Sequence, residues 1–391
     1  MKKIGLYLTE YPYKGGSYQY NLIMIEAVAS LPKDVFQSII VYADDVWKDI
    51  AKRYNLPTKK IERSFIAKVF HRGWFSGGLP LNIWRKISYF IHPVAKELIT
   101  QNCDLWIFPS QDVWSYQVPI PALVTIYDLM HRYEKRFPEV HTHTDRDKHY
   151  KQICKWAKGI LVDSEVGKQQ VVESYGINPQ KINVLPFVPP KYIYNSNLPY
   201  GFDQRYQLPK KFIFYPTQFW KHKNHKNLLK ALSMLRKRYP DINLVFVGAK
   251  KNGYESTLRL VQELELSKVV FFLGYVPDED MPELYRRARA MVMPTFFGPT
   301  NIPPLEANAL GCPVAVSNIY AMPEQLGAAA LYFNPFSINE IAEAIERLWT
   351  DDLLCAELRE RGLIQASKWD QSHFNKRLCQ IIIDVLRLNL K

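Results

Sequence analysis

Short apolar runs alternate with amphipathic segments along nearly the whole chain, and turn residues separate them. The runs have the length of buried strands, while the segments between them carry apolar residues at helical spacing. This alternation predicts an α/β fold with parallel, doubly wound sheets. In the first half we expect strands at 4–8, 38–42, 105–108, 122–126 and 159–163, and helices at 21–30 and 168–175.

The alternation starts again after a stretch rich in Pro, Asn and Tyr, a composition typical of a linker. The 391 residues also exceed what one core usually supports. We predict an N-terminal domain at 1–190, a linker at 191–210 and a C-terminal domain at 211–391, with the last helix as a candidate to cross back to the first domain. In the second half we expect strands at 212–215, 244–248, 269–273, 290–294 and 314–317, and helices at 227–238, 254–264, 281–289, 304–310 and 338–350.

The net charge of +13 predicts anionic partners, either nucleic acid, lipid headgroups or phosphorylated small molecules. The sequence contains no zinc-finger or RNP-type signature, so we do not expect nucleic acid. The five cysteines are scattered without CxxC pairs. This spacing predicts neither a zinc site nor a disulfide framework, and it favours a reducing, cytoplasmic compartment.

Two neighbouring segments, 64–75 and 81–90, interleave Trp and Phe with Lys and Arg. An interfacial membrane surface needs such apolar bodies in the acyl boundary and such cations at the phosphates. The alternative is a pair of helices packed on their own domain with solvated basic residues. Both readings stay open, and no run reaches the roughly 18 uncharged apolar residues of a spanning helix.

A Gly/Pro-rich loop at 296–301 leads into an expected helix that carries Glu306 one turn inside. Backbone N–H groups and the positive dipole end of such a helix bind a diphosphate, while the carboxylate binds a ribose. This combination predicts a sugar-nucleotide site. The alternative is an ordinary junction between strand and helix.

These motifs resemble those of the retaining family-four (group 1) glycosyltransferases, the class that builds bacterial lipopolysaccharide, capsule and glycolipids. The resemblance covers nearly the whole chain, and is strongest at 212–351 and weaker before residue 122. It implies the GT-B fold, in which two Rossmann-like domains face each other across a cleft. Open parallel sheets bind ligands beyond the carboxyl ends of their strands, so we expect the active site in that cleft.

The resemblance implies specific roles for the loop at 296–301, which we call the donor loop, and for the helix that follows it. Glu306 matches the second Glu of the family's motif, the ribose ligand, but Gly298 stands where the family has the first Glu, which faces the donor sugar. That role is therefore dropped, shifted, or taken by Thr300 or Asn301. The backbone amides of Thr300, Asn301 and Ile302 are expected to meet the diphosphate and the sugar.

Further donor contacts are implied at the ends of the first and third strands of the second half. Lys223 matches a family Lys that pairs with the diphosphate, with Lys221 as a helper, whereas Gln218 replaces the family's Arg. Leaving-group stabilisation would then rest more heavily on Lys223. Tyr275 and Val276 lie in a turn whose backbone brackets the nucleotide base.

In the first half, Gly15 and Gly16 form a loop that lets the backbone approach a donor phosphate or an acceptor. A tight turn needs the same residues. Asp128 matches an acidic residue of the family, and Tyr127 replaces the His before it. Tyr127 or His131 would take over that role, or Asp128 would orient the site; a buried structural Tyr is the alternative.

The expected activity is retaining, metal-independent hexosyl transfer from a nucleotide-diphosphate sugar to a glycan or lipid-linked acceptor, without a cofactor, at the inner face of the cytoplasmic membrane. The sequence offers no carboxylate pair of the glycosidase kind and no Asp-x-Asp motif for a cation. General resemblance gives a slight preference for GDP-mannose. The alternatives are a GT-B-fold sugar-nucleotide epimerase and a catalytically silent sugar-nucleotide-binding protein.

Overall fold

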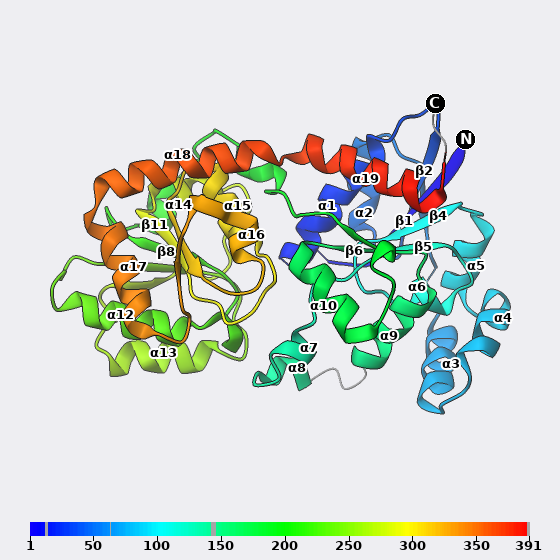
Figure 1. Ribbon diagram of the computed structural model, residues 1–391, viewed down its shortest axis with the longest axis horizontal. Helices are drawn as coiled ribbons and strands as arrows, with labels where there is room; N and C mark the ends of the chain where they lie inside the picture. The colour runs from blue at the N-terminus through cyan, green and yellow to red at the C-terminus, as the bar shows by residue number, and fades with distance from the viewer. Residues whose placement is uncertain (12–14, 63, 142–145, 389–391) are drawn as a thin grey trace. The chain divides into compact units, whose positions relative to one another are not determined.

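The computed structural model describes residues 1–11, 15–62, 64–141 and 146–388 (Figure 1). The chain divides into two compact units. The first consists of Met1–His131, His143–Phe187 and Gln371–Lys391, and the second of Arg132–Thr142 and Val188–Asp370.

The first unit contains a parallel sheet of seven strands in the order β3-β2-β1-β4-β5-β6-β7. Its central strands are apolar and buried, as a sheet covered on both faces requires. The strand order reverses between β1 and β4. The strands are β1 (Lys2–Leu8), β2 (Phe36–Tyr42), β3 (Thr58–Lys60), β4 (Leu105–Phe108), β5 (Ala122–Thr125), β6 (Gly159–Val162) and β7 (Ile182–Val184).

Helices accompany this sheet, and the carboxyl-terminal helix α19 packs against α1 (Figure 1). Gln371 of α19 donates a hydrogen bond to the carbonyl of Ile23 at 3.2 Å. The helices are α1 (Gly16–Ala29), α2 (Val46–Arg53), α3 (Phe65–Ser76), α4 (Leu81–Ile91), α5 (Pro93–Thr100), α6 (Trp114–Gln117), α7 (Met130–Tyr133), α9 (Arg146–Trp156), α10 (Glu165–Tyr175) and α19 (Gln371–Leu386).

The second unit contains a parallel sheet of six strands in the order β10-β9-β8-β11-β12-β13, which reverses between β8 and β11. Its strands are β8 (Ile213–Pro216), β9 (Leu244–Val247), β10 (Val270–Phe272), β11 (Ala290–Met293), β12 (Val314–Ser317) and β13 (Leu331–Phe333). Its helices are α8 (Pro138–His141), η3 (Lys191–Tyr194), α11 (Phe202–Tyr206), η4 (Lys221–Lys223), α12 (His225–Arg236), α13 (Tyr254–Glu263), α14 (Met281–Arg287), α15 (Ile302–Ala309), α16 (Met322–Leu326), α17 (Ile338–Thr350) and α18 (Asp352–Lys368).

The predicted α/β class with parallel sheets is confirmed, and every predicted strand is present. The prediction missed three short strands, β3, β7 and β13. Residues 191–210, expected to be a linker, contain η3 and α11. Ile193 and Phe202 from this stretch are buried in the core of the second unit.

Candidate functional site

The loop before α15 is shaped by Gly298 and Asn301. Gly298 has a φ of 134°, a conformation that favours glycine. A Cβ atom at this position would lie 2.7 Å from Asn301 Nδ2 and 3.0 Å from Asn301 Oδ1. The Asn301 side chain therefore fills the space that a side chain at position 298 would need.

The first turn of α15 offers few backbone donors. Asn301 is the N-cap residue, and its N–H donates to Gln325 Oε1 at 3.0 Å. Pro303 and Pro304 have no N–H group. Ile302 therefore carries the one amide donor among the first three helical residues. The Asn301 N–H is one of the three backbone amides predicted to meet the diphosphate and the sugar, but in the structure it is bonded to Gln325.

Lys223 follows β8, whereas the loop before α15 follows β11, and the strand order reverses between these two neighbouring strands. The Lys223 side chain contacts this loop. Its Nζ donates to Asn301 Oδ1 at 2.9 Å, so two residues predicted from separate motifs are brought together. The backbone at this point is fixed by Tyr215, whose hydroxyl donates to the Lys223 carbonyl at 2.6 Å. Asn224 then adopts a φ of 60° and donates to the carbonyls of Pro294 and Pro335.

Glu306 on α15 is only 4% exposed. Its Oε1 accepts a hydrogen bond from Tyr192 and its Oε2 one from Tyr285, both at 2.5 Å. Burial raises the pKa of Glu306, and the two tyrosine hydrogen bonds counter that rise. An ionised carboxylate has about four lone-pair positions, so these bonds leave Glu306 capacity to accept from ribose hydroxyls. Sequence reasoning found Glu306 but neither tyrosine.

The ends of β8, β9 and β10 are held close together. Gly248 after β9 has a φ of 146°, and a Cβ atom there would lie 2.2 Å from the Thr217 carbonyl oxygen. Its N–H donates to the Gly274 carbonyl at 2.8 Å. These contacts place the predicted turn of Tyr275 and Val276 near the end of β8; Tyr275 is 63% exposed and Val276 is buried.

The side chain of Gln218, which replaces a family Arg, has a local partner. Its Oε1 accepts a hydrogen bond from Trp220 Nε1 at 2.9 Å. The amide is half-buried at the end of β8 and adds no charge there. Lys223 is thus the predicted diphosphate ligand that brings a cation to this loop.

A segment from the first half of the sequence, Arg132–Thr142, belongs to the second unit. Glu139 of this segment accepts from His222 N at 3.1 Å, His222 Nδ1 at 2.6 Å and Asn252 Nδ2 at 2.8 Å. Burial by itself would raise the pKa of Glu139, but the hydrogen bonds outweigh it and lower the pKa to about 2. Glu139 therefore anchors His222, the residue before Lys223 in η4.

Replacing Glu139 by Gln is expected to lower the free energy of unfolding by about 1–3 kcal/mol at pH 7. Since the folded pKa is below the ordinary value of 4.5, the carboxylate stabilises the fold above pH 4.5, and this contribution is lost as pH falls towards 2. Urea unfolding at pH 7 and pH 3 tests this. The gap to wild type should shrink at pH 3, and Glu263→Gln, an exposed control on α13, should show no gap. A gap that does not change with pH would contradict the assignment.

The predicted residues of the first half lie in the first unit. Gly15 is the N-cap of α1 with a φ of 62°, and Gly16 is the first residue of the helix. The Tyr127 hydroxyl donates to the Pro109 carbonyl. Asp128 Oδ1 accepts from Met130 N at 2.8 Å and lies 3.8 Å from Arg146 Nη2. Both side chains have structural partners, and their predicted roles in transfer stay predictions.

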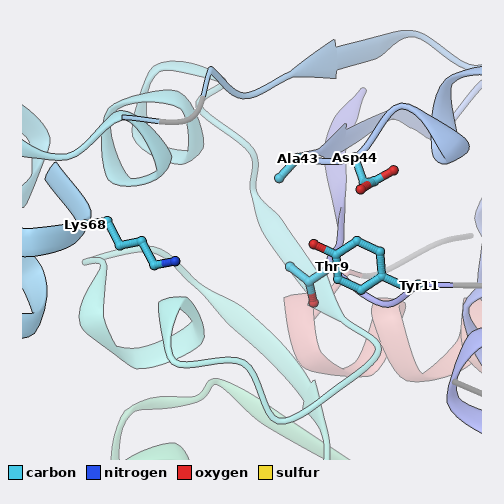
Figure 2. A pocket seen from close by; sticks show the side chains of 5 residues that line it. All are labelled: Thr9, Tyr11, Ala43, Asp44 and Lys68. Atoms are coloured by element: carbon cyan, nitrogen blue, oxygen red, sulfur yellow. The ribbon is translucent and has the colours of Figure 1, made fainter. Parts of the chain in front are cut away.

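A cavity of about 290 Å³ opens in the first unit beyond the carboxyl ends of β1 and β2 (Figure 2). The residues that line it are Thr9, Tyr11, Ala43, Asp44 and Lys68. Figure 2 shows the Lys68 side chain extending from α3 towards this group. Sequence reasoning did not single out the cavity, because its lining comes from three separate segments. Within the described residues, no group of three or more His, Cys, Asp or Glu is placed to hold a metal ion.

Residues 202–365 match the family model "Glycosyl transferases group 1". O-antigen chain mannosyltransferase B of Escherichia coli is 35% identical over 173 residues, which cover 42% of this chain and 44% of that protein. O-antigen chain mannosyltransferase RfbU of Salmonella typhimurium is 31% identical over 198 residues, which cover 51% of this chain and 53% of that protein. The matched regions therefore span about half the length of these curated relatives.

Solved structures resemble the chain over nearly its full length. A glycosyltransferase from Rickettsia africae has a TM-score of 0.74 at 17% identity, with 99% of both chains covered. Anabaena Alr3699/HepE in complex with UDP-glucose has a TM-score of 0.74 at 14% identity, with 98% of this chain and 100% of that chain covered. Together with the two parallel sheets, this likeness confirms the predicted GT-B fold.

Proposed function

We propose that this chain is a group 1 glycosyltransferase and that it transfers a hexose from a nucleotide-diphosphate sugar to a glycan or lipid-linked glycan in polysaccharide synthesis. The observation that carries the proposal is the 2.9 Å contact between Lys223 Nζ and Asn301 Oδ1. It joins a cation to the donor loop at the reversal between β8 and β11, where open parallel sheets bind their ligands. The O-antigen mannosyltransferases among its relatives support a role in surface glycans.

The proposed reaction retains the anomeric configuration. The bond between the sugar C1 and the diphosphate oxygen breaks, and the acceptor oxygen forms a bond to C1 from the same face. The acceptor proton passes to the departing phosphate oxygen. Lys223 and the Ile302 amide stabilise the negative charge that develops on the diphosphate, and neither a metal ion nor a cofactor is needed.

Asn301 is proposed to take over the sugar contact that the family makes from position 298. Its side chain fills the space beside Gly298 and already bonds to Lys223. An amide both donates and accepts hydrogen bonds, whereas the family's carboxylate only accepts when ionised. The donor-sugar hydroxyls would therefore meet a neutral group with different bonding preferences.

Gly298→Glu, which restores the family residue, is expected to harm the protein. The φ of 134° and the contact with Asn301 should lower the free energy of unfolding by about 1–3 kcal/mol. Transfer activity should fall as well, because the new side chain displaces Asn301. Urea unfolding and kcat/KM measure the two effects. Gly73→Ala, where a Cβ meets nothing within 4 Å, should be neutral or stabilising. Higher activity of Gly298→Glu would contradict the role of Asn301.

The donor is proposed to be GDP-mannose, which the mannosyltransferase relatives support. Thermal unfolding with GDP, UDP and dTDP and their sugars tests this choice. A ligand present at 100 times its Kd stabilises the folded state by about 2.7 kcal/mol. The largest rise in Tm should come with GDP or GDP-mannose. A larger rise with UDP or dTDP would overturn the choice of base, and no rise with any nucleotide would oppose the donor site itself.

The acceptor is proposed to be lipid-linked, and the protein to act at the inner face of the cytoplasmic membrane. In the part of the chain that the structure describes, no helix is long and apolar enough to cross a membrane. The contact with the bilayer is proposed to be peripheral. The basic, aromatic helices α3 and α4 of the first unit support this contact.

A further inference from the structure

Helices α3 and α4 of the first unit present large apolar side chains to solvent. On α3, Phe65 is 80% exposed and Ile66 is 81% exposed, and on α4 Phe90 is 81% exposed. Soluble proteins rarely leave such side chains together on one surface unless that surface binds something. We call this surface the α3–α4 face; its apolar members are Phe65, Ile66, Val69, Phe70, Leu79, Ile83 and Phe90.

The two helices hold together through side chains outside the α3–α4 face and through Phe70, whose ring stacks on that of Trp84 with centroids 6.5 Å apart. Trp84 of α4 is fully buried, and its ring centroid lies 5.1 Å from that of His71 and 5.7 Å from that of Trp74. On α3, residues 65, 66, 69 and 70 follow helical spacing and so share one side, whereas Ala67 is buried. The exposed side is thus a distinct apolar stripe that needs no refolding to become available.

The charge around this stripe has a single sign. Residues 64–92 contain no Asp or Glu, but they contain four Lys and Arg residues. Lys68, Arg72 and Lys86 are exposed, whereas Arg85 donates to the Val118 carbonyl at 2.9 Å. Long cationic side chains beside apolar ones match the boundary of an anionic bilayer, where the stems lie among the acyl chains and the charges reach the phosphates.

We propose that the α3–α4 face docks on an anionic lipid bilayer. A second copy of this chain fits less well, because it would place like charges against each other without a carboxylate to pair them. Lys68 belongs both to α3 and to the lining of the cavity beyond β1 and β2. Docking would therefore bring that cavity close to the headgroup layer. The proposal goes beyond sugar transfer and does not depend on the donor chemistry.

Flotation of the full chain with vesicles tests the proposal. Wild type should float with vesicles of phosphatidylcholine containing phosphatidylglycerol and much less with pure phosphatidylcholine. The triple variant Phe65→Ser, Ile66→Ser, Phe90→Ser should bind on the order of tenfold or more weakly. The pair Arg72→Gln, Lys86→Gln should bind the anionic vesicles about 30-fold more weakly at low salt.

A matched control removes exposed apolar residues elsewhere. Leu353, Leu363 and Ile364 on α18 are 85%, 46% and 50% exposed, and their replacement by Ser should leave flotation unchanged. All variants should keep the wild-type Tm and its shift with nucleotide, which separates loss of docking from loss of the donor site. Wild type that stays with the soluble fraction, or a triple variant that floats like wild type, would overturn the proposal. Salt-sensitive binding to a polyglutamate resin without vesicle binding would point to an acidic protein partner instead and would also overturn it.

Discussion

Lys223→Ala is expected to slow sugar transfer by about 100- to 1000-fold, the usual cost of removing a preorganised group that stabilises developing charge. Gln218 supplies no charge at the position of the family's Arg, so little remains to compensate for the lost cation. The effect should appear in single-turnover rates with saturating donor and acceptor. Folding should be nearly unaffected, because the variant removes a hydrogen bond that is only partly buried.

Lys226→Ala is the matched control, since Lys226 is an exposed lysine on the first turn of α12. It carries the same charge close to the same strand end but bonds to no part of the donor loop in the structure. Its rate should stay within about twofold of wild type, as for most surface substitutions. Equal losses in the two variants would mean that general positive charge, rather than the position of Lys223, drives the reaction.

Glu306→Gln should weaken nucleotide binding by about 10- to 100-fold, because a charge-assisted hydrogen bond to a ribose hydroxyl is worth roughly 1.5–3 kcal/mol. The amide keeps the shape of the carboxylate, and so the packing of α15 against Tyr192 and Tyr285 should survive. Calorimetric titration with nucleoside diphosphate measures the loss, and urea unfolding shows whether the fold is intact.

Tyr192→Phe separates the two roles that Glu306 could have. It removes one of the two hydrogen bonds to the carboxylate at a cost of about 1 kcal/mol in stability, but leaves the charge in place. Nucleotide affinity should then stay within a few-fold of wild type. If Glu306→Gln binds nucleotide normally, or if Tyr192→Phe loses as much affinity, the carboxylate is a structural group and not the ribose ligand.

The strands of both sheets could be predicted because buried parallel strands are continuous apolar runs. The strand β4 and the strand β12 were predicted with their observed bounds. The edge strand β3 was missed because its sequence, Thr-Lys-Lys, is polar and too short to show a period. Hydrophobic pattern thus predicts the centre of each sheet better than its edges.

The site residues that lie within short sequence motifs could be predicted, whereas contacts between residues far apart in the sequence could not. Spacing within the loop predicted that Gly298 lacks the family's side chain, but only the three-dimensional structure shows that Asn301 fills the gap. The contact of Glu139 with His222 spans 83 positions, and that of Tyr192 with Glu306 spans 114. No local pattern marks such pairs, since neither a tyrosine nor a lone glutamate signals its partner.

Sugar transfer itself is tested most directly by product analysis. The purified protein is incubated in excess EDTA with GDP-mannose and a lipid-linked glycan acceptor, and the products are identified by mass spectrometry and NMR. The proposed function predicts an acceptor extended by one hexose, free GDP, and the same anomeric configuration in product and donor. An inverted linkage would contradict the retaining mechanism, and loss of activity in EDTA would contradict metal independence. An epimerised nucleotide sugar without extended acceptor would show that the protein is not a transferase.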